Sequence, residues 1–387
     1  MSAFRYSDLS ISVIIPAFNA DQTIERCLIS IIKAAPFKKE IIVIDDGSTD
    51  RTYEIASKYA IKLLHQGQNK GAAAAKNIGL VQASGEIVAF VDSDCIVEEN
   101  YFAELISALN EAKIAVGGVG GIIYPLESGL VSDSFNIRFF GCSPVGERKI
   151  REIESLSGAA SIYPKAVLLK VGGFDENING GEDLDLNIRI RKAGYKLLLV
   201  PSAKTYHFHP AKMRQLAKKW FCYGKLLVVI SRKNGLKKDV ALSLGWFYGC
   251  VALLMIGFFT SQLFVWGLLV LTLCFPWLLN YGKETVKFWV RNRKIKYFVF
   301  PFIHQIVIVS RSLGVVVGTF SRLPKKDKNN STSRKLLLNP ATIKAFNPLI
   351  SIFYVGTTAV LAEIQLHTRK KANYVFRHSN HQEKNSA

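Results

Sequence analysis

The stretches IIVIDDGSTD (residues 41–50) and GEIVAFVDSD (residues 85–94) decide how the first half of the chain folds. In each stretch, a short run of apolar residues leads directly into a cluster of aspartates. Such runs are typical of strands buried on both faces, as in a parallel sheet covered by helices. Ligands of these sheets bind beyond the carboxyl ends of the strands. The aspartates therefore indicate a binding site, although Asp-Gly-Ser clusters are also common in turns and at helix N-termini.

The sequence on either side continues the alternation of strands and helices. With strands at 40–44 and 87–91, we expect further strands at 11–16, 61–65, 117–124, 158–163 and 194–200. We expect helices at 24–32, 50–59, 71–82 and about 183–192. Strands that alternate with helices predict an α/β domain with a mostly parallel sheet, which we assign to residues 1–210.

Charge divides the chain into two parts. Residues 1–203 carry 21 Lys and Arg against 25 Asp and Glu, a net charge of −4, whereas residues 204–387 carry 29 against 5, a net charge of +24. A basic segment suits nucleic acid or an anionic membrane surface. No charged residue lies between Asp239 and Lys283, a stretch longer than the roughly 20 residues that cross a bilayer once. This favours membrane lipids over nucleic acid as the partner.

The C-terminal half is predicted to anchor the chain in a membrane. A basic and aromatic juxtamembrane segment at 211–239 precedes two predicted spans within 240–281, at 240–259 and 263–281. Basic flanks on both sides predict that the N-terminal domain is cytoplasmic. Residues 282–370 are expected to form interfacial helices, or two further spans at 298–320 and 349–366, and residues 371–387 a disordered tail. A secretory signal pattern and CxxC spacing are absent, so we expect reduced thiols.

Six motifs occur in order over about 190 residues: SVIIPAFNA (12–20), IIVIDDGSTD (41–50), NKGAAAAKN (69–77), GEIVAFVDSD (85–94), GGFDE (172–176) and GEDLDLNIRIRKAGY (181–195). Together they resemble the motifs of family 2 glycosyltransferases of the GT-A fold. The resemblance implies a GT-A type nucleotide-binding domain with a mixed sheet, a nucleotide-sugar donor and a divalent cation, Mg²⁺ or Mn²⁺. A cation held by carboxylates neutralises the charge that develops on the departing diphosphate.

Three aspects of the metal site follow from the resemblance. Asp94 is expected to bind the metal directly, while Asp92 faces the ribose or reaches the metal through water. Ser93 lies between them in the DxD motif and is assigned to the donor site. His207 in YHFHP is expected to complete the metal site as a neutral imidazole, with an ordinary strand-end histidine as the alternative.

The resemblance also assigns residues to the rest of the donor. Asp46 is expected to bind the base, and Pro16 and Phe18 to line the base pocket. Lys76 occupies a position where the family usually has arginine, so we expect it to contact the nucleotide or diphosphate, or else to be a surface lysine of its helix.

The acceptor hydroxyl must lose a proton as it attacks. The resemblance implies that Asp183 is the general base, with Glu182 beside it as a supporting residue of the donor site; helix N-capping is the alternative for Asp183. Trp220 is expected to stack on a sugar or to lie at the membrane interface. The residues before it depart from the Q/RxxRW motif of processive synthases, which argues against a polymerising enzyme.

These assignments predict an inverting, metal-dependent glycosyltransferase that is non-processive. Its donor is expected to be a UDP-sugar and its acceptor a lipid-linked or membrane-proximal glycan at the cytoplasmic face of the cell membrane. One alternative is a synthase of polyprenyl-phosphate sugars, which shares the fold. Another is an inactive membrane scaffold, although the DxD and Glu-Asp motifs are intact. A nicotinamide oxidoreductase is disfavoured because no GxGxxG follows the first strand.

Overall fold

The computed structural model describes the parts of the chain that form the sheet and three C-terminal helices. The described residues are 10–34, 38–112, 114–127, 129–133, 149–178, 180–209, 212–235, 237–260 and 300–320. The predicted second span at 263–281, the possible span at 349–366 and the predicted tail at 371–387 lie outside these residues. So does most of the segment 282–370, for which interfacial helices are expected.

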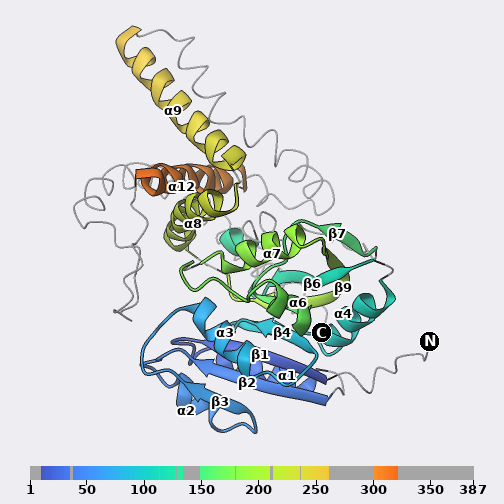
Figure 1. The fold of residues 1–387 in the computed structure, drawn as a ribbon. Helices are drawn as coiled ribbons and strands as arrows, with labels where there is room; N and C mark the ends of the chain where they lie inside the picture. Colours follow the sequence, from blue (N-terminus) through green and yellow to red (C-terminus); the bar gives the residue numbers. More distant parts are fainter. Residues whose placement is uncertain are drawn as a thin grey trace, which may run out of the picture. The chain divides into compact units, whose positions relative to one another are not determined.

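A mixed sheet forms the centre of the domain (Figure 1). Its strands are β1 (Ser10–Ala17), β2 (Lys38–Asp45), β3 (Lys62–His65), β4 (Ile87–Val91), β5 (Cys95–Val97), β6 (Val116–Pro125), β7 (Arg151–Ile153), β8 (Ala160–Pro164) and β9 (Lys196–His207). They follow the order β3-β2-β1-β4-β8-β6-β9-β5, and β7 pairs with β9. Strands β1 to β4 are parallel, and β6 is parallel to β9, whereas β5, β7 and β8 run antiparallel to their neighbours. The predicted α/β fold with a mixed sheet is confirmed.

Helices cover both faces of this sheet. They are α1 (Ile24–Lys33), α2 (Thr52–Ala56), α3 (Ala72–Gln82), α4 (Tyr101–Glu111), α6 (Lys165–Lys170) and α7 (Glu182–Lys192). Alternate residues of β1 face opposite sides: Val13 and Ile15 pack with α1 and α4, and Ile14 packs with α3, α6 and α7. Burial of one such side chain contributes about 1.5–3 kcal/mol. This two-sided burial explains why the strands are continuous apolar runs.

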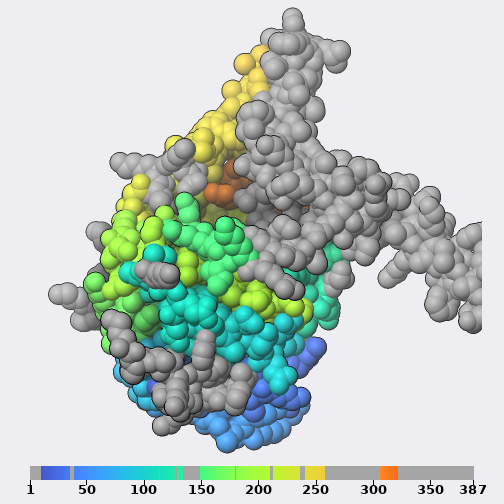
Figure 2. Space-filling view, turned by 90° about the vertical axis from the view of Figure 1, so that its right-hand side faces the viewer, coloured from blue at the N-terminus to red at the C-terminus, as the bar shows by residue number. Residues whose placement is uncertain are grey.

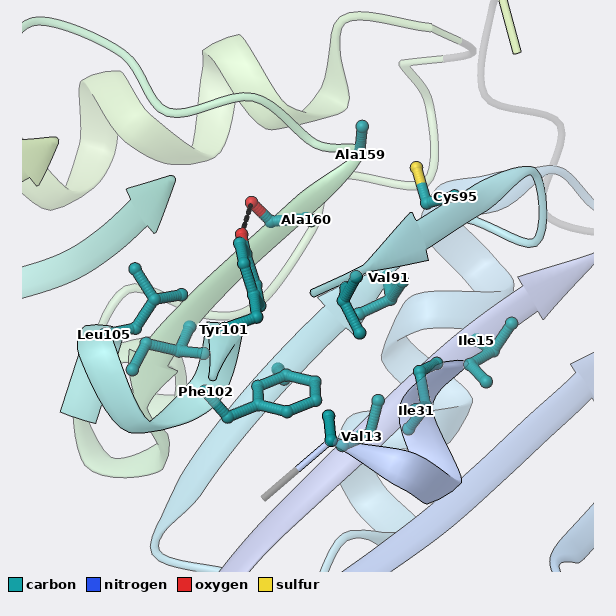
Figure 3. Close-up of a cluster of buried hydrophobic side chains, with 14 of the residues drawn as sticks. Val13, Ile15, Ile31, Val91, Cys95, Tyr101, Phe102, Leu105, Ala159 and Ala160 are labelled. Carbon is teal, nitrogen blue, oxygen red and sulfur yellow. Dashed lines mark hydrogen bonds between the residues drawn. The ribbon is translucent and has the colours of Figure 1, made fainter. Parts of the chain in front are cut away.

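The first of these two cores contains aromatic side chains of α4 (Figure 3). Tyr101 and Phe102 are fully buried, and their rings meet edge to face with centroids 5.5 Å apart. The Tyr101 hydroxyl donates a hydrogen bond to the carbonyl oxygen of Ala160 on β8 at 3.0 Å. This bond ties α4 to β8.

Two strand features differ from the sequence-based expectation and matter for the site. The strand expected at 194–200 continues as β9 to His207, and a short strand, β5, begins directly after Asp94. Cys95 on β5 is the register partner of His207 on β9. Hydrophobic patterning missed β5 because it has only three residues. The helix expected at 50–59 is shorter, as α2 covers only Thr52–Ala56.

Among the described residues, three helices follow the sheet: α8 (Met213–Asn234), α9 (Lys237–Thr260) and α12 (Phe300–Phe320). In α9, the segment 240–257 is the one described stretch long and apolar enough to cross a membrane, and only 6% of it is buried. Within the described residues the structure thus offers one candidate span where two to four were considered. Helix α12 packs on α8 and contains the buried Val307 and Val315; a small part of its orange surface is visible in Figure 2.

Candidate active site

Asp92 and Asp94 lie in the turn that joins β4 to β5, with Ser93 between them. The Asp92 N–H donates to the carbonyl oxygen of Ala159 at 2.8 Å, and the Cys95 N–H donates to the carbonyl oxygen of Asp92 at 3.0 Å. These bonds fix the turn at the carboxyl end of β4, next to the start of β8. The pairing of β5 with β9 then brings Asp94 Oδ1 to 3.4 Å from His207 Nε2.

Asp94, Cys95 and His207 form a group that fits a metal ion. Their ligand atoms lie within 4.8 Å of one another. Burial, followed by the charge of Lys219, lowers the pKa of His207 to about 4, so its imidazole is neutral at neutral pH. Neutral imidazole and carboxylate suit Mn²⁺, whereas burial raises the pKa of the Cys95 thiol and keeps it protonated. Asp92 does not belong to this group.

A second histidine orients the first. His207 Nδ1 and His209 Nδ1 are 3.0 Å apart, so one ring donates a proton to the other. Burial and the neighbouring His207 lower the pKa of His209 to about 3. When His207 Nδ1 is the donor of this bond, its Nε2, which lies 3.4 Å from Asp94 Oδ1, carries the lone pair that a metal ion needs.

Asp183 sits in the first turn of α7, just after Gly180 and Gly181. Both glycines have positive φ angles, +98° and +71°, at which a residue with a side chain would be strained. Asp183 Oδ2 accepts a hydrogen bond from the Gly158 N–H at 2.9 Å, and Oδ1 accepts one from the Leu184 N–H at 2.8 Å. Burial, and then the charge of Glu182, raise the pKa of Asp183 to about 6. Its carboxylate is therefore a base poised near neutral pH.

Lys76 links Glu182, the neighbour of Asp183 on α7, to the DxD turn. Its side chain is 1% exposed, so the surface-lysine alternative is wrong. Lys76 Nζ donates to Glu182 Oε1 at 2.9 Å and lies 3.5 Å from Asp92 Oδ1. Burial opposes its charge, but Glu182 and Asp92 together hold the pKa of Lys76 above its usual value. The buried cation thus bridges the turn after β4 and the N-terminus of α7, about 90 residues apart in sequence.

The residues expected to bind the nucleobase of the donor lie at the same edge of the sheet. Pro16 is at the end of β1, where Phe18 follows with 47% of its surface exposed. Asp46 directly follows β2 and is buried, and its two oxygens accept the N–H groups of Lys70 and Gly71, both at 2.8 Å. Burial raises the pKa of Asp46. Each of its oxygens retains a lone pair for a further donor.

A cavity of about 640 Å³ brings several of the predicted residues together. Its lining includes Lys76, Asp92, Glu182, Asp183, His207 and Trp220. Pro16, Phe18, Asp46, Ser93 and Asp94 are not among the described lining residues, although Asp94 adjoins the cavity through His207. Trp220 comes from α8 and is buried, so the interface alternative for this residue is disfavoured.

Sequence reasoning missed most of the other lining residues, among them the cations Arg151, Lys219 and Arg311 and the phenol of Tyr223. Lys219 directly precedes Trp220, at the position of the second arginine in the Q/RxxRW motif of processive synthases. This position could have marked Lys219 as a site residue. Burial lowers the pKa of Lys219, and nearby carboxylates oppose this shift, the strongest being Asp94 and Asp92. Arg311 had no local signal because it reaches the cavity only through the packing of α12.

Comparisons with known proteins agree with this architecture. The family model "Glycosyl transferase family 2" matches residues 12–151, and "Glycosyl transferase family group 2" matches residues 87–282. Glycosyltransferase AglE of Haloferax volcanii is 28% identical over 60% of this chain and 79% of its own length. The pre-mycofactocin glycosyltransferase of Mycobacterium tuberculosis is 26% identical over 66% of this chain, which spans only 57% of that relative. The mannosyltransferase of Pyrobaculum calidifontis, solved with GDP-Man and Mn²⁺, shares the fold with a TM-score of 0.55 at 19% identity, covering 79% of this chain and 86% of its own.

Proposed function

The chain belongs to glycosyl transferase family group 2, whose model matches about half of it, and from this premise we propose an inverting, metal-dependent transfer from a nucleotide sugar. The acceptor is a hydroxyl of a lipid-linked or membrane-proximal glycan. The observation that carries the proposal is that one cavity holds Asp92 of the DxD motif and Asp183, a carboxylate with a pKa of about 6.

Asp183 takes the proton of the acceptor hydroxyl. Its two backbone donors hold the carboxylate in one orientation, and its pKa of about 6 leaves it mostly ionised at neutral pH. The acceptor oxygen forms a bond to the anomeric carbon as the bond from that carbon to the diphosphate breaks. A general base of this kind typically contributes about 10² to 10⁴ in rate. A single displacement inverts the anomeric configuration.

Asp94 and His207 are the residues that would hold a divalent cation, with Asp92 nearby. Mn²⁺ or Mg²⁺ supplies Lewis-acid stabilisation of the departing diphosphate when bound. Lys219 adds a second positive charge near the same carboxylates and is suited to the diphosphate. Asp46, Pro16 and Phe18 hold the base, for which uracil is the first candidate.

Lys76 has a positioning role in this scheme instead of the predicted contact with donor phosphate. Its amine is occupied by Glu182 and Asp92 and is fully buried. The bridge fixes the distance between the DxD turn, where the metal would bind, and the N-terminus of α7, which carries the general base Asp183. Glu182 acts through Lys76 and through its charge on Asp183.

Helix α9 is proposed to anchor the enzyme, with the sheet domain on the cytoplasmic side. Its exposed apolar side chains include Leu242, Val251 and Leu254, which suits a lipid environment. An enzyme held at the membrane meets acceptors that are themselves in the membrane.

The experiment is a transfer assay with the full chain in detergent and a panel of nucleotide sugars. We expect donor turnover with Mn²⁺ or Mg²⁺, its loss with a chelator, and its loss in Asp94→Ala. Undiminished turnover in the presence of excess chelator would rule out the metal assignment. Proton NMR of the first product gives the anomeric configuration, and retention would exclude the single displacement.

A synthase of polyprenyl-phosphate sugars is the rival that the same experiment separates. A phosphate oxygen is already ionised and needs no general base, so Asp183→Asn would leave its rate nearly unchanged. Thin-layer chromatography of radiolabelled products, with polyprenyl phosphate as the acceptor, tests this rival directly.

A further inference from the structure

A cysteine lies among the residues that fit a metal ion. Cys95 follows Asp94 directly and is the first residue of β5. It is the register partner of His207 on β9, and residues that are directly opposite in an antiparallel pair place their side chains on the same face of the sheet. One turn and one pair of strands therefore bring the three side chains together. The transfer proposed above uses Asp94 and His207 and gives Cys95 no role.

The separations between the three ligand atoms suit a small tetrahedral site. With bonds of about 2.1 Å to oxygen and nitrogen and about 2.3 Å to sulfur, a tetrahedral ion holds oxygen about 3.4 Å from nitrogen and about 3.6 Å from sulfur. His207 Nε2 lies 3.4 Å from Asp94 Oδ1, and Cys95 Sγ lies 4.0 Å from that oxygen. All three atoms are within 4.8 Å of one another. A small shift of the Cys95 side chain completes such a site.

The other acid of the DxD turn is held elsewhere. Asp92 Oδ1 lies 3.5 Å from Lys76 Nζ, and Asp92 is outside the group of metal-ligand atoms. Cys95 is thus the third ligand that the described residues offer beside Asp94 and His207. Its side chain is fully buried, so water does not compete for the sulfur, and the Asp94 side chain is 37% exposed, so an ion can enter.

Sulfur changes which ions such a site prefers. Thiolate is a soft ligand that selects Zn²⁺ and similar ions, whereas oxygen ligands suit Mg²⁺ and Mn²⁺. An ion that coordinates a thiol displaces its proton, which passes to solvent, and the charge of the ion then compensates the buried thiolate. Lys219 lies near the same carboxylates, but its charge repels every divalent cation alike and does not alter the preference.

We propose that Asp94, Cys95 and His207 together form a site for a thiophilic divalent cation, Zn²⁺ or Cd²⁺, which inhibits transfer by taking the place of Mn²⁺ or Mg²⁺. The binding stands on the three ligand atoms, and the inhibition rests on the proposed function. A tetrahedral ion with three protein ligands keeps one open position. A six-coordinate ion on Asp94 and His207 keeps four for diphosphate oxygens and water. The thiophilic ion thus holds the protein with more ligands and offers the diphosphate fewer positions.

The binding test uses Cd²⁺ alone as the probe, with the full chain in a nonionic detergent and a phosphine reductant. A cadmium–thiolate bond absorbs in the ultraviolet by charge transfer, so the absorption reports sulfur directly. We expect a saturable band that is lost in Cys95→Ser and in Cys95→Ala. In Asp94→Ala and in His207→Ala we expect binding to weaken at least about tenfold, since even the partners of metal ligands contribute that much. Cys222→Ser removes an exposed thiol of α8 and is the matched control, which keeps the band.

X-ray absorption of the zinc-loaded protein identifies the ligands without any substitution. We expect one sulfur at about 2.3 Å from the ion. A shell of oxygen and nitrogen alone would overturn the site. So would a cadmium band that is unchanged in both Cys95 variants.

Inhibition is measured on donor turnover with Mn²⁺. We expect Zn²⁺ to inhibit and excess Mn²⁺ to relieve the inhibition. Relative to the uninhibited rate of each protein, the Zn²⁺ concentration for half-inhibition should rise at least about tenfold in Cys95→Ser. Equal inhibition of Cys95→Ser and the unmodified chain would overturn the inhibitory role. A lack of turnover with Mn²⁺ alone would instead contradict the proposed function, and the cadmium and zinc measurements would still decide the site.

Discussion

The sheet domain and the α8–α12 helix pair contribute to one cavity in different ways. In the sheet domain, each functional side chain stands at the end of a strand or at the start of a helix, next to its own sequence motif. In the helix pair, Arg311 reaches the cavity only because Gly224 and Gly314 let two backbones touch. Local motifs thus place the carboxylates of the cavity, and helix packing supplies another part of its lining.

The largest effect is expected from a substitution in the sheet domain that removes the general base Asp183. Asp183→Asn keeps the shape but cannot accept a proton, so we expect transfer to fall by about 10² to 10⁴. Donor binding should change little, as measured by a thermal shift with the nucleotide diphosphate and Mn²⁺. A variant that loses transfer and donor binding equally would mean that Asp183 acts in donor binding and is no base.

The pH dependence sharpens the same assignment. The pKa of Asp183 is raised to about 6, so the carboxylate is protonated and inactive below that pH. We expect the rate at limiting acceptor to fall about tenfold per pH unit below about 6 and to level off above it. The low-pH slope should disappear from the residual activity of Asp183→Asn, and its persistence would assign the slope to another group.

The packing of α8 against α12 is expected to be most sensitive to substitution at Gly224, where the two backbones touch. In Gly224→Ala the new methyl group would lie 2.0 Å from the Arg311 carbonyl oxygen, so α12 must move. Overpacking of this kind costs typically about 1–3 kcal/mol. We expect weaker acceptor use, with donor binding retained. Gly245→Ala is the matched control, since nothing lies within 4 Å of a Cβ at that position of α9.

Equal loss of donor binding and acceptor use in Gly224→Ala would contradict the division between the two regions. Limited proteolysis should show the helix pair loosened while the sheet domain remains resistant.

A smaller effect is expected where α8 is fastened to α7. Lys233 Nζ contacts Asp175 Oδ2 at 2.7 Å and Asp185 at 2.9 Å, and Asn234 Nδ2 donates to Asp185 Oδ1 at 2.8 Å. Lys233→Met leaves the buried Asp185 with fewer partners. Because Lys233 is partly exposed, we expect a loss of only about 1 kcal/mol in unfolding free energy. Chemical denaturation measures it, with Lys218→Met on the exposed face of α8 as the control.

The sequence allowed prediction of the parts of the molecule that are encoded locally. Continuous apolar runs predicted β1, β2 and β4, and the acids at their ends fall at one edge of the sheet, because parallel strands end together. The three-residue β5 gave no periodic signal, yet it brings Asp94 to His207. The burial of Lys76 was also hidden, because it depends on Glu182, which lies 106 positions further along the chain. Arg311 is the extreme case, since only the packing of two distant helices reveals it.

The most direct test of the central claim is a crystal structure of the enzyme with Mn²⁺ and a nucleoside diphosphate, with manganese located by anomalous scattering. We expect the ion between Asp94 and His207, with the terminal phosphate facing the cavity that contains Asp183. Manganese bound elsewhere, or a diphosphate that points away from Asp183, would contradict a single site shared by the metal and the base.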